Sequence, residues 1–258
     1  DILDIVQKIK KLDVKTTIVS NGELIDRNMS CFNEIDRLNV SIHSMNEDTY
    51  DSIIQRKNKL SKVIHNLSQL RNLNKKIDIR INMTIVRGQN DDIENMKKII
   101  SLAKKVNASI KIIELFTDKK EQIVPIYEIK KELIKLNFKV LEEYTHKIVL
   151  FDGTTKIILS KIFCAAANDR YNPNSYCNSF NDLFVSPDGV IKLCRYLKQE
   201  VSIKEEVKNK DLWLELIEAL EEEFYQIEKI KGHQKNGNYN DYVDKLAVKA
   251  STWLMEKK

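Results

Sequence analysis

The sequence contains few of the residues that interrupt regular structure and few signals of a specialised protein class. Its 258 residues include 3 Pro and 6 Gly, and no apolar run approaches the roughly 18 residues that a membrane span requires. We recognise no signal-peptide pattern in these 258 residues and therefore expect a cytoplasmic protein without a membrane association. The net charge of +5 comes from 43 basic and 38 acidic residues spread along the chain. This distribution does not predict specific nucleic-acid binding.

Several common catalytic motifs are also absent. The chain has no Gly-x-Gly-x-x-Gly, P-loop, Gly-x-Ser-x-Gly or His-Glu-x-x-His segment. These absences exclude the commonest nucleotide-binding, hydrolase and zinc-protease classes. The 42% hydrophobic and 31% charged content is typical of a globular protein, and the length suits one large domain or a domain with a small appendage.

The hydrophobic pattern up to residue 117 predicts helices that alternate with strands. The predicted helices cover 2–12, 24–34, 46–74 with an interruption at 56–58, and 91–106 with Asp91 as its N-cap. The predicted strands cover 14–20, 37–42, 77–86 and 109–115. Strands separated by helices indicate an α/β fold with a parallel sheet, either an open barrel or a doubly wound sheet.

The pattern changes after residue 117, and we therefore expect two regions, 1–117 and 118–258. The second begins with a predicted helix over 121–137 and ends with a mostly helical tail over 203–257. Between them the pattern predicts strands at 139–143, 147–151 and 156–159, followed by a cysteine-rich hairpin. The second region is thus expected to be a small β-hairpin and helical extension.

Three of the four cysteines, Cys164, Cys177 and Cys194, lie within about thirty residues of one another. The segment between the last two predicts a β-hairpin with its turn at Pro187-Asp188-Gly189, which would bring Cys177 close to Cys194. Three converging thiolates can hold an iron–sulfur cluster or a zinc ion with one open metal position. Buried structural thiols and disulfides are the alternatives. We expect Cys31 to be a buried packing residue.

Small polar residues follow the predicted strands. In parallel α/β folds functional groups lie at the carboxyl ends of strands. The segments at these ends are 20–22, 41–44, 87–90 and 114–117, and His43 is the one histidine placed for chemistry.

Arg80 and Asn82 lie within the strand predicted over 77–86, on the face opposite to Ile79 and Ile81. A polar face in mid-strand is unusual in a covered parallel sheet, so it indicates an occupied interior or, alternatively, an edge strand with a wet face. For Arg80 we expect an anionic substrate group as the partner, with a salt bridge to Glu114 as the alternative.

These segments together resemble the radical S-adenosylmethionine (SAM) superfamily. The similar segments, in chain order, are 17–22, 37–44, 79–92 and 112–115. The second of them is similar to the family's Leu-Asn-Val-Ser-Leu-Asp strand. The cysteine hairpin resembles that of the GTP cyclase of molybdenum-cofactor biosynthesis (MoaA-like) and the SPASM and twitch extensions. Asp182-Leu183-Phe184 replaces an Arg-rich run of that cyclase, which favours another substrate.

The resemblance implies a radical SAM enzyme that generates a 5′-deoxyadenosyl radical for hydrogen abstraction. Its fold would be a partial (β/α)₆ barrel over 1–117 with an auxiliary cluster extension over 118–258. The implied cofactors are SAM with its own [4Fe–4S] cluster, and an auxiliary [4Fe–4S] cluster. The implied site residues are Ser20, Asn21 and Ser41 for SAM, Arg80 for the substrate, and Cys164, Cys177 and Cys194 for the auxiliary cluster.

The family's Cys-x-x-x-Cys-x-x-Cys motif does not occur in the 258 residues. Because the chain opens directly in a helical pattern at Asp1, we expect it to be the C-terminal part of a longer protein that carries this motif upstream. We also expect an open sheet edge beside strand 14–20. The expected partners are a small-molecule or peptide substrate and a reductant protein such as a flavodoxin or ferredoxin. The alternative is a non-catalytic metal-binding α/β module that binds a partner.

Overall fold

A computed structural model of the chain describes residues 2–12, 14–144, 147–161, 184–187, 189–192 and 201–202. The chain divides into two compact units, Asp1–Ile162 and Phe163–Lys258. None of the helices among these described residues is long and apolar enough to span a membrane.

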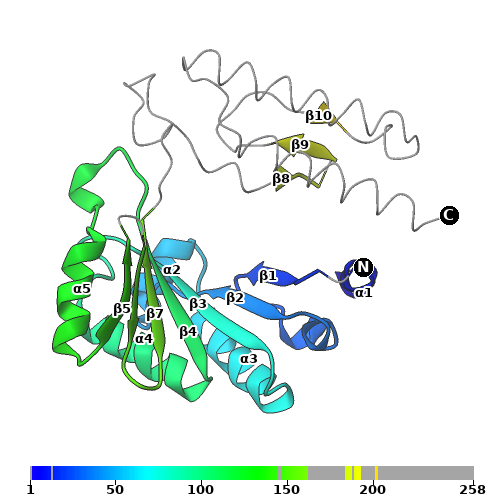
Figure 1. The fold of residues 1–258 in the computed structure, drawn as a ribbon, viewed down its shortest axis with the longest axis horizontal. Helices are drawn as coiled ribbons and strands as arrows, with labels where there is room; N and C mark the ends of the chain where they lie inside the picture. Colours follow the sequence, from blue (N-terminus) through cyan, green and yellow to red (C-terminus); the bar gives the residue numbers. More distant parts are fainter. Residues whose placement is uncertain are drawn as a thin grey trace. The chain divides into compact units, whose positions relative to one another are not determined.

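The first unit alternates helices and strands along the chain (Figure 1). Its helices are α1 (Ile2–Lys10), α2 (Glu47–Ile54), α3 (Leu60–Leu73), α4 (Ile93–Lys105) and α5 (Ile126–Lys135). Its strands are β1 (Thr17–Ser20), β2 (Arg37–Ser41), β3 (Asp78–Ile85), β4 (Ala108–Glu114), β5 (Lys139–Tyr144), β6 (Lys147–Phe151) and β7 (Lys156–Ser160). Short 3₁₀ helices occupy Asp26–Asn28, Cys31–Asn33 and Lys120–Gln122. The predicted α/β class is confirmed.

The seven strands form one sheet in the order β1-β2-β3-β4-β7-β6-β5. Strands β1 to β4 and β7 run parallel, whereas β5 and β6 are antiparallel to their neighbours. The expected parallel sheet is therefore present, and it extends without a break into the three strands after residue 117. The boundary between units falls at Ile162, which differs from the expected change of architecture at 117.

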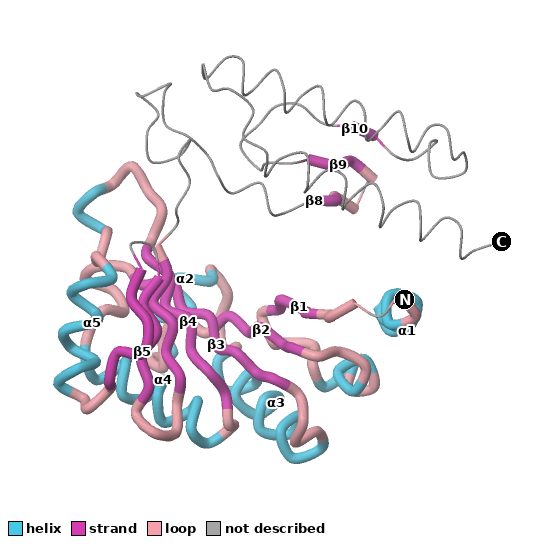
Figure 2. Tube along the Cα trace, in the orientation of Figure 1, coloured by secondary structure: helices cyan, strands magenta, loops and turns pink. Residues whose placement is uncertain are grey.

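The two faces of the sheet differ in chemistry because side chains alternate along each strand. One face is apolar and packs against α3, α4 and α5, which lie on the same side of the sheet in the tube view (Figure 2). Leu38, Ile81 and Ile112 are among its residues and are almost fully buried. The other face carries half-buried polar side chains and is the basis of the candidate site.

Helix termini and turns account for two differences from the sequence prediction. Residues 24–34 form two 3₁₀ turns in place of one α-helix. The side chain of Asn28 donates to the carbonyl of Leu24, a bond that competes with regular helix formation. The N-cap of α4 is Asp92, whose carboxylate accepts from the backbone N–H of Asn95 at 2.7 Å, and not Asp91.

The helix predicted over 121–137 is shorter than expected. Pro125 is the N-cap of α5, since proline disfavours a helical conformation in the residue before it and lacks an N–H donor. By contrast, the predicted interruption of the 46–74 region is confirmed. Gln55 and Asn58 both adopt positive φ between α2 and α3.

In the second unit, β8 (Phe184–Val185) pairs antiparallel with β9 (Val190–Lys192), and β9 pairs with β10 (Val201–Ser202). Gly189 has φ of 80°, and its N–H donates to the carbonyl of Ser186 across the turn. The predicted hairpin with its turn at 187–189 is confirmed.

The edge strand β1 pairs only with β2 among the strands that the structure describes, and Val19 is 67% exposed. This agrees with the open edge expected beside strand 14–20.

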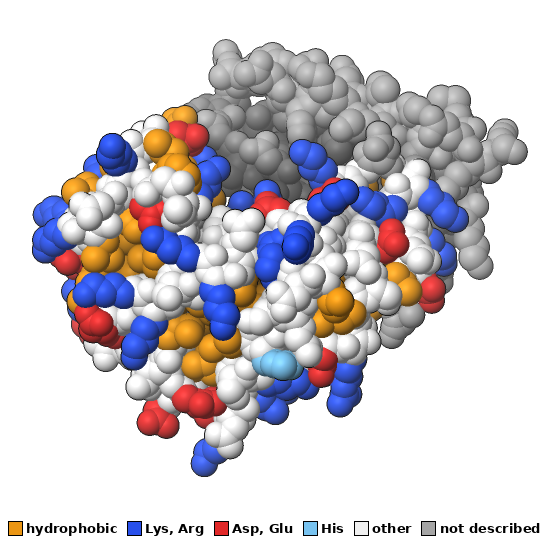
Figure 3. Space-filling view, turned by 90° about the horizontal axis from the view of Figure 1, so that it is seen from below, with side chains coloured by type: hydrophobic (Ala, Val, Ile, Leu, Met, Phe, Trp, Pro, Cys, Tyr) orange, Lys and Arg blue, Asp and Glu red, His pale blue; other side chains and the backbone are white. Residues whose placement is uncertain are grey.

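On the face seen from below, Lys and Arg side chains are interspersed with acidic and neutral ones (Figure 3). Among the coloured side chains of that face, which belong to the described residues, no stripe of one charge is visible.

Candidate functional site

The polar face of the sheet is built by residues that are neighbours across β2, β3 and β4. Strand pairing places Asn39 beside Arg80, Arg80 beside Ser109, and Asn82 between Ser41 and Lys111. Neighbouring positions of parallel strands present their side chains to the same face. All six side chains are half-buried. The strands therefore hold a polar patch at fixed spacing.

The two cations of this patch, Arg80 and Lys111, interact electrostatically, and neither forms a salt bridge within the part of the chain that the structure describes. Arg80 donates from Nε to Ser109 Oγ at 3.5 Å, and this is its one hydrogen bond among the described residues. Burial lowers the pKa of Arg80, as does Arg37, while Asp78 raises it. Burial also lowers the pKa of Lys111, and the charge of Arg80 adds to that effect. An anion bound here would offset both the repulsion and part of the desolvation cost.

The amide oxygens of Asn39 and Asn82 are fully buried and accept no hydrogen bond within the described structure. A buried acceptor without a donor costs roughly 1–3 kcal/mol. Both asparagines border Arg80 or Lys111. The orphaned oxygens thus mark positions where a donor from water or a ligand would be stabilising.

Ser41 ends β2 on the same face, and its hydroxyl makes no hydrogen bond in the part of the chain that the structure describes. The group is not fully buried either. A free hydroxyl at the carboxyl end of a parallel strand is suited to contact a ligand. The position of Ser41 is therefore compatible with its predicted role in binding SAM.

Ser20 and Asn21 are engaged in the turn that follows β1. Ser20 pairs with Val40 and so belongs to the helix-covered face, and its Oγ accepts from the N–H of Gly22 at 3.1 Å. The side chain of Asn21 accepts from the N–H of Glu23 at 3.1 Å and donates to its carboxylate at 3.2 Å. The structure thus places Ser20 and Ser41 on opposite faces, although both lie at the same edge of the sheet. Their binding of SAM stays a prediction.

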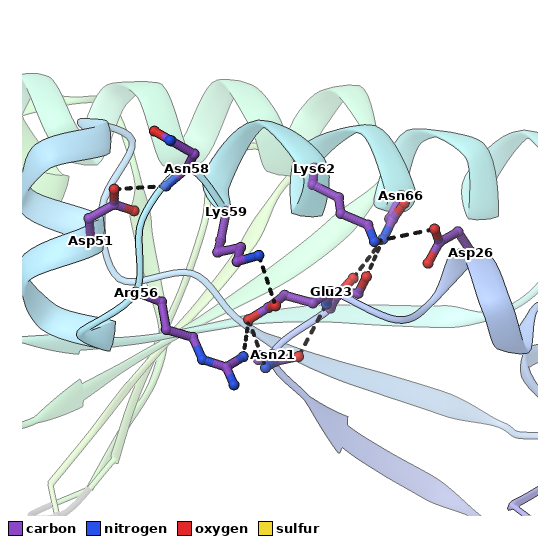
Figure 4. Close-up of polar contacts among 10 residues, drawn as sticks. Asn21, Glu23, Asp26, Asp51, Arg56, Asn58, Lys59, Lys62 and Asn66 are labelled. Carbon is purple, nitrogen blue, oxygen red and sulfur yellow. Dashed lines mark hydrogen bonds and ion pairs between the residues drawn. The ribbon is translucent and has the colours of Figure 1, made fainter.

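The carboxylate of Glu23 connects this turn to the loop between α2 and α3 (Figure 4). Its Oε1 accepts from Arg56 at 2.9 Å, and its Oε2 lies 3.8 Å from the ammonium of Lys59. The side chain of Glu23 is 12% exposed and that of Arg56 is 59% exposed, so the carboxylate is sheltered while solvent still screens the guanidinium. The loop is thereby fastened beside Asn21 at the edge of the sheet.

Two buried asparagines, Asn90 and Asn95, hold the segments that follow β2 and β3. Asn90, which is fully buried, donates to the carbonyls of His43 and Thr84 at 2.8 and 2.9 Å. Asn95 accepts from the N–H of Met45 at 2.7 Å and donates to the carbonyl of Asn90. The loops after β2 and β3 are therefore held at a fixed separation.

The alternative partner for Arg80 is excluded. The carboxylate of Glu114 accepts from the N–H of Ile126 at 3.1 Å and lies 3.9 Å from the ammonium of Lys161. It forms no salt bridge with Arg80 among the described residues, so that alternative is wrong. Arg80 is left with one weak contact on a half-buried face.

The predicted cluster ligands Cys164, Cys177 and Cys194 lie outside the described residues. Within the described residues no group of three or more His, Cys, Asp or Glu side chains could hold a metal. Cys31 is 1% exposed, which confirms the packing role expected for it. Burial and the nearby Glu34 raise the pKa of its thiol.

Lys111 was not among the site residues predicted from the sequence. It alternates with Ile110 and Ile112 in β4, the same signal that identified Arg80 in β3. Glu23 was also missed, because an acidic residue after a strand carries no distinctive pattern by itself.

Comparison with known proteins gives two family matches. Residues 1–100 match the radical SAM superfamily. Residues 188–252 match RNase H. Most of this second range lies outside the described residues, and the match covers about a quarter of the chain.

Two curated relatives are similar over most of the chain. A GTP 3′,8-cyclase of Limosilactobacillus fermentum is 25% identical over 236 residues, which cover 79% of this chain and 62% of the relative. A GTP 3′,8-cyclase of Clostridium perfringens (strain SM101 / Type A) is 27% identical over 245 residues, with coverages of 87% and 70%. The chain therefore spans about two thirds of the length of these relatives.

The structure of Streptococcus suis SuiB bound to S-adenosylmethionine has a TM-score of 0.53 and 12% identity, covering 80% of this chain and 49% of that chain. This likeness concerns the fold alone. The match of residues 1–100 and the two curated relatives confirm the predicted resemblance to the radical SAM superfamily.

Proposed function

From the match of residues 1–100 to the radical SAM superfamily, we propose that this chain forms the SAM- and substrate-binding sheet of a radical SAM enzyme. The observation that carries the proposal is the half-buried polar face formed by β2, β3 and β4. A polar face with orphaned amide oxygens and unpaired cations suits a bound ligand better than a packing surface.

The cofactor SAM would bind at the carboxyl ends of β1 and β2. The residues present fit it, because Ser41 offers a free hydroxyl and Asn21 retains one amide N–H beyond its bonds to Glu23. When bound with its iron–sulfur cluster, SAM supplies a 5′-deoxyadenosyl radical that abstracts hydrogen from the substrate. The motif for that cluster is not among the 258 residues, so no residue here is assigned to it.

The substrate would present an anionic group to Arg80 and Lys111. A guanidinium binds carboxylate or phosphate through two parallel hydrogen bonds, and an ammonium adds a point charge. Arg80 has four N–H donors beyond its contact with Ser109. The anion would also raise the lowered pKa of Lys111 toward its ordinary value.

The auxiliary cluster on Cys164, Cys177 and Cys194 is a further part of the proposal. Its support is the predicted hairpin, which is formed by β8 and β9. Cys177 precedes this hairpin in the sequence and Cys194 follows it. A cluster there would bind substrate at an open iron or transfer an electron. A reductant protein is required for the first electron.

The anion site can be tested with inorganic pyrophosphate as a probe, measured by isothermal titration of the full chain. Arg80→Met should weaken pyrophosphate binding about 10- to 100-fold, because a charge-assisted hydrogen bond contributes roughly 1.5–3 kcal/mol. Arg37→Met is the matched control. Arg37 lies on the same face, but its guanidinium is already paired with Asp78 at 2.6 Å.

The same titrations with SAM test the cofactor site independently, since Arg80→Met should leave SAM affinity within about twofold. Equal effects of the two arginine variants on pyrophosphate would show a diffuse surface attraction and would contradict the proposed role of Arg80.

A further inference from the structure

An imidazole stands on the polar face where the superfamily's strand motif, as given above, has an aspartate. His43 is the second residue after Ser41 and follows the same alternation, with Ile42 fully buried between them. Residues two apart on an extended strand are separated by roughly 6.6 Å. A ligand of nucleoside size that contacts Ser41 can therefore also reach His43.

The structure fixes which ring nitrogen of His43 carries the proton. The backbone N–H of Thr84 donates to Nδ1 at 3.1 Å. If β2 continued beside β3, one of its backbone carbonyls would accept from the N–H of Thr84. Nδ1 of His43 accepts that hydrogen bond instead. A nitrogen that accepts must be unprotonated, so the neutral ring carries its proton on Nε2.

The backbone around the ring is held in place. Asn90 donates from one amide group to the carbonyls of both His43 and Thr84. The two residues joined by the ring are therefore also joined by a buried amide. This arrangement keeps Nδ1 opposite the Thr84 N–H without help from a ligand.

The second ring nitrogen has no hydrogen-bond partner in the described part of the chain. Nε2 is also not among the fully buried orphaned atoms, so it is open to a ligand or to water. Burial of the rest of the ring lowers the pKa of His43, with no contribution from a neighbouring charge. The imidazole is thus held neutral with one donor available.

We infer that His43 is a ligand-contacting residue, donating a hydrogen bond from Nε2–H to an acceptor atom of SAM bound beside Ser41. The inference rests on the proposed function and extends it by a residue in which this chain departs from the superfamily's strand motif. A neutral donor selects ligands that present a hydrogen-bond acceptor. It adds no positive charge to a face that already carries Arg80 and Lys111.

The test uses the full chain, SAM as the probe, and a variant that separates the two nitrogens. In His43→Asn the amide oxygen occupies the place of Nδ1 and can accept from Thr84, but the side chain is too short to reach the place of Nε2. SAM binding should weaken about fivefold to tenfold, as for the loss of one neutral hydrogen bond. Hydrogen exchange of the Thr84 amide should remain slow.

Nitrogen NMR of the unaltered chain provides a second measurement that does not depend on the variant. The His43 ring should show protonated Nε2 and unprotonated Nδ1, and SAM should shift the Nε2 resonance. An unchanged SAM affinity in His43→Asn, with normal affinity in the unaltered chain, would overturn this inference and leave the SAM site intact. A protonated Nδ1 would overturn it as well. Failure of the unaltered chain to bind SAM would overturn the SAM site and this contact together.

Discussion

At the scale of single residues, Gly22 shows how closely the turn beside the candidate site is packed. Its φ is 81°, a conformation that side chains with a Cβ rarely adopt. A Cβ at this position would lie 2.9 Å from methyl groups of both Val40 and Val63. The turn therefore needs glycine for two independent reasons, conformation and space.

We predict that Gly22→Ala destabilises the protein more than Gly88→Ala. Both glycines have positive φ, which costs alanine roughly 1–2 kcal/mol, but a Cβ at Gly88 would meet no atom within 4 Å. Overpacking at Gly22 should add about 1–3 kcal/mol. Urea unfolding followed by circular dichroism would measure the difference. Equal losses would mean that Val40 and Val63 move aside without cost.

The residues of the site were predictable only in part. Arg80 was recognisable because strand alternation placed a cation opposite buried isoleucines. The contact of Glu23 with Arg56 joins positions 33 residues apart and depends on the path of the chain. A single sequence carries no signal for such contacts.

At the scale of secondary-structure elements, two adjacent aspartates precede α4 and only one caps it. The carboxylate of Asp92 accepts from the N–H of Asn95, whereas that of Asp91 accepts from the N–H of Gly88 in the preceding loop. The helix must place Met96, Ile99 and Ala103 against the sheet, and this requirement selects the cap. Local sequence alone did not distinguish the two.

We expect Asp92→Ala to lower the free energy of unfolding by about 1 kcal/mol, the usual cost of losing an N-cap. The matched variant Asp91→Ala removes only an exposed loop contact and should cost less than half as much. Thermal unfolding of both variants measures this. A larger loss from Asp91→Ala would show that the loop conformation, and not the cap, determines where α4 begins.

The secondary-structure predictions were correct where hydrophobic periodicity was strong and wrong where short polar residues were frequent. The alternation in β3 was read correctly along its length. Residues 24–34 contain Asp26, Asn28, Ser30 and Asn33, residue types whose side chains can compete for backbone groups, and the side chain of Asn28 does so by donating to the carbonyl of Leu24. Two 3₁₀ turns result. They still bury Ile25 and Phe32 against the core, which is why an apolar pattern was visible.

At the scale of the whole molecule, the extent of the sheet was the feature that the sequence did not reveal. Strands β5, β6 and β7 were each predicted, but their union with the parallel strands depends on pairing between β4 and β7. Hydrophobic alternation indicates which side chains of a strand are buried, but it does not indicate which strand lies next to it in the sheet. The pairing of β4 with β7 could therefore not be predicted.

The metal chemistry proposed for the second unit can be tested on the entire chain. Anaerobic reconstitution with iron and sulfide should produce a broad absorbance at about 400 nm, typical of thiolate-bound clusters. Cys194→Ala should abolish it, because one proposed ligand is lost. Cys31→Ala should retain it, since Cys31 is buried in the core of the first unit. Retention in Cys194→Ala would show that the cluster ligands have been misassigned.

The pairing of β4 with β7 also affects how chain entropy is lost during folding. Ile110 pairs with Ile157, 47 positions along the sequence, whereas the turn that joins β6 to β7 pairs Phe151 with Lys156. Loop closure costs roughly 0.6 kcal/mol for each doubling of length, so direct closure of the longer loop costs about 2 kcal/mol more. Forming the β6–β7 hairpin first shortens the distance that remains to be closed. The three strands after residue 117 thus act as a local template that lowers the entropic barrier to extending the parallel sheet.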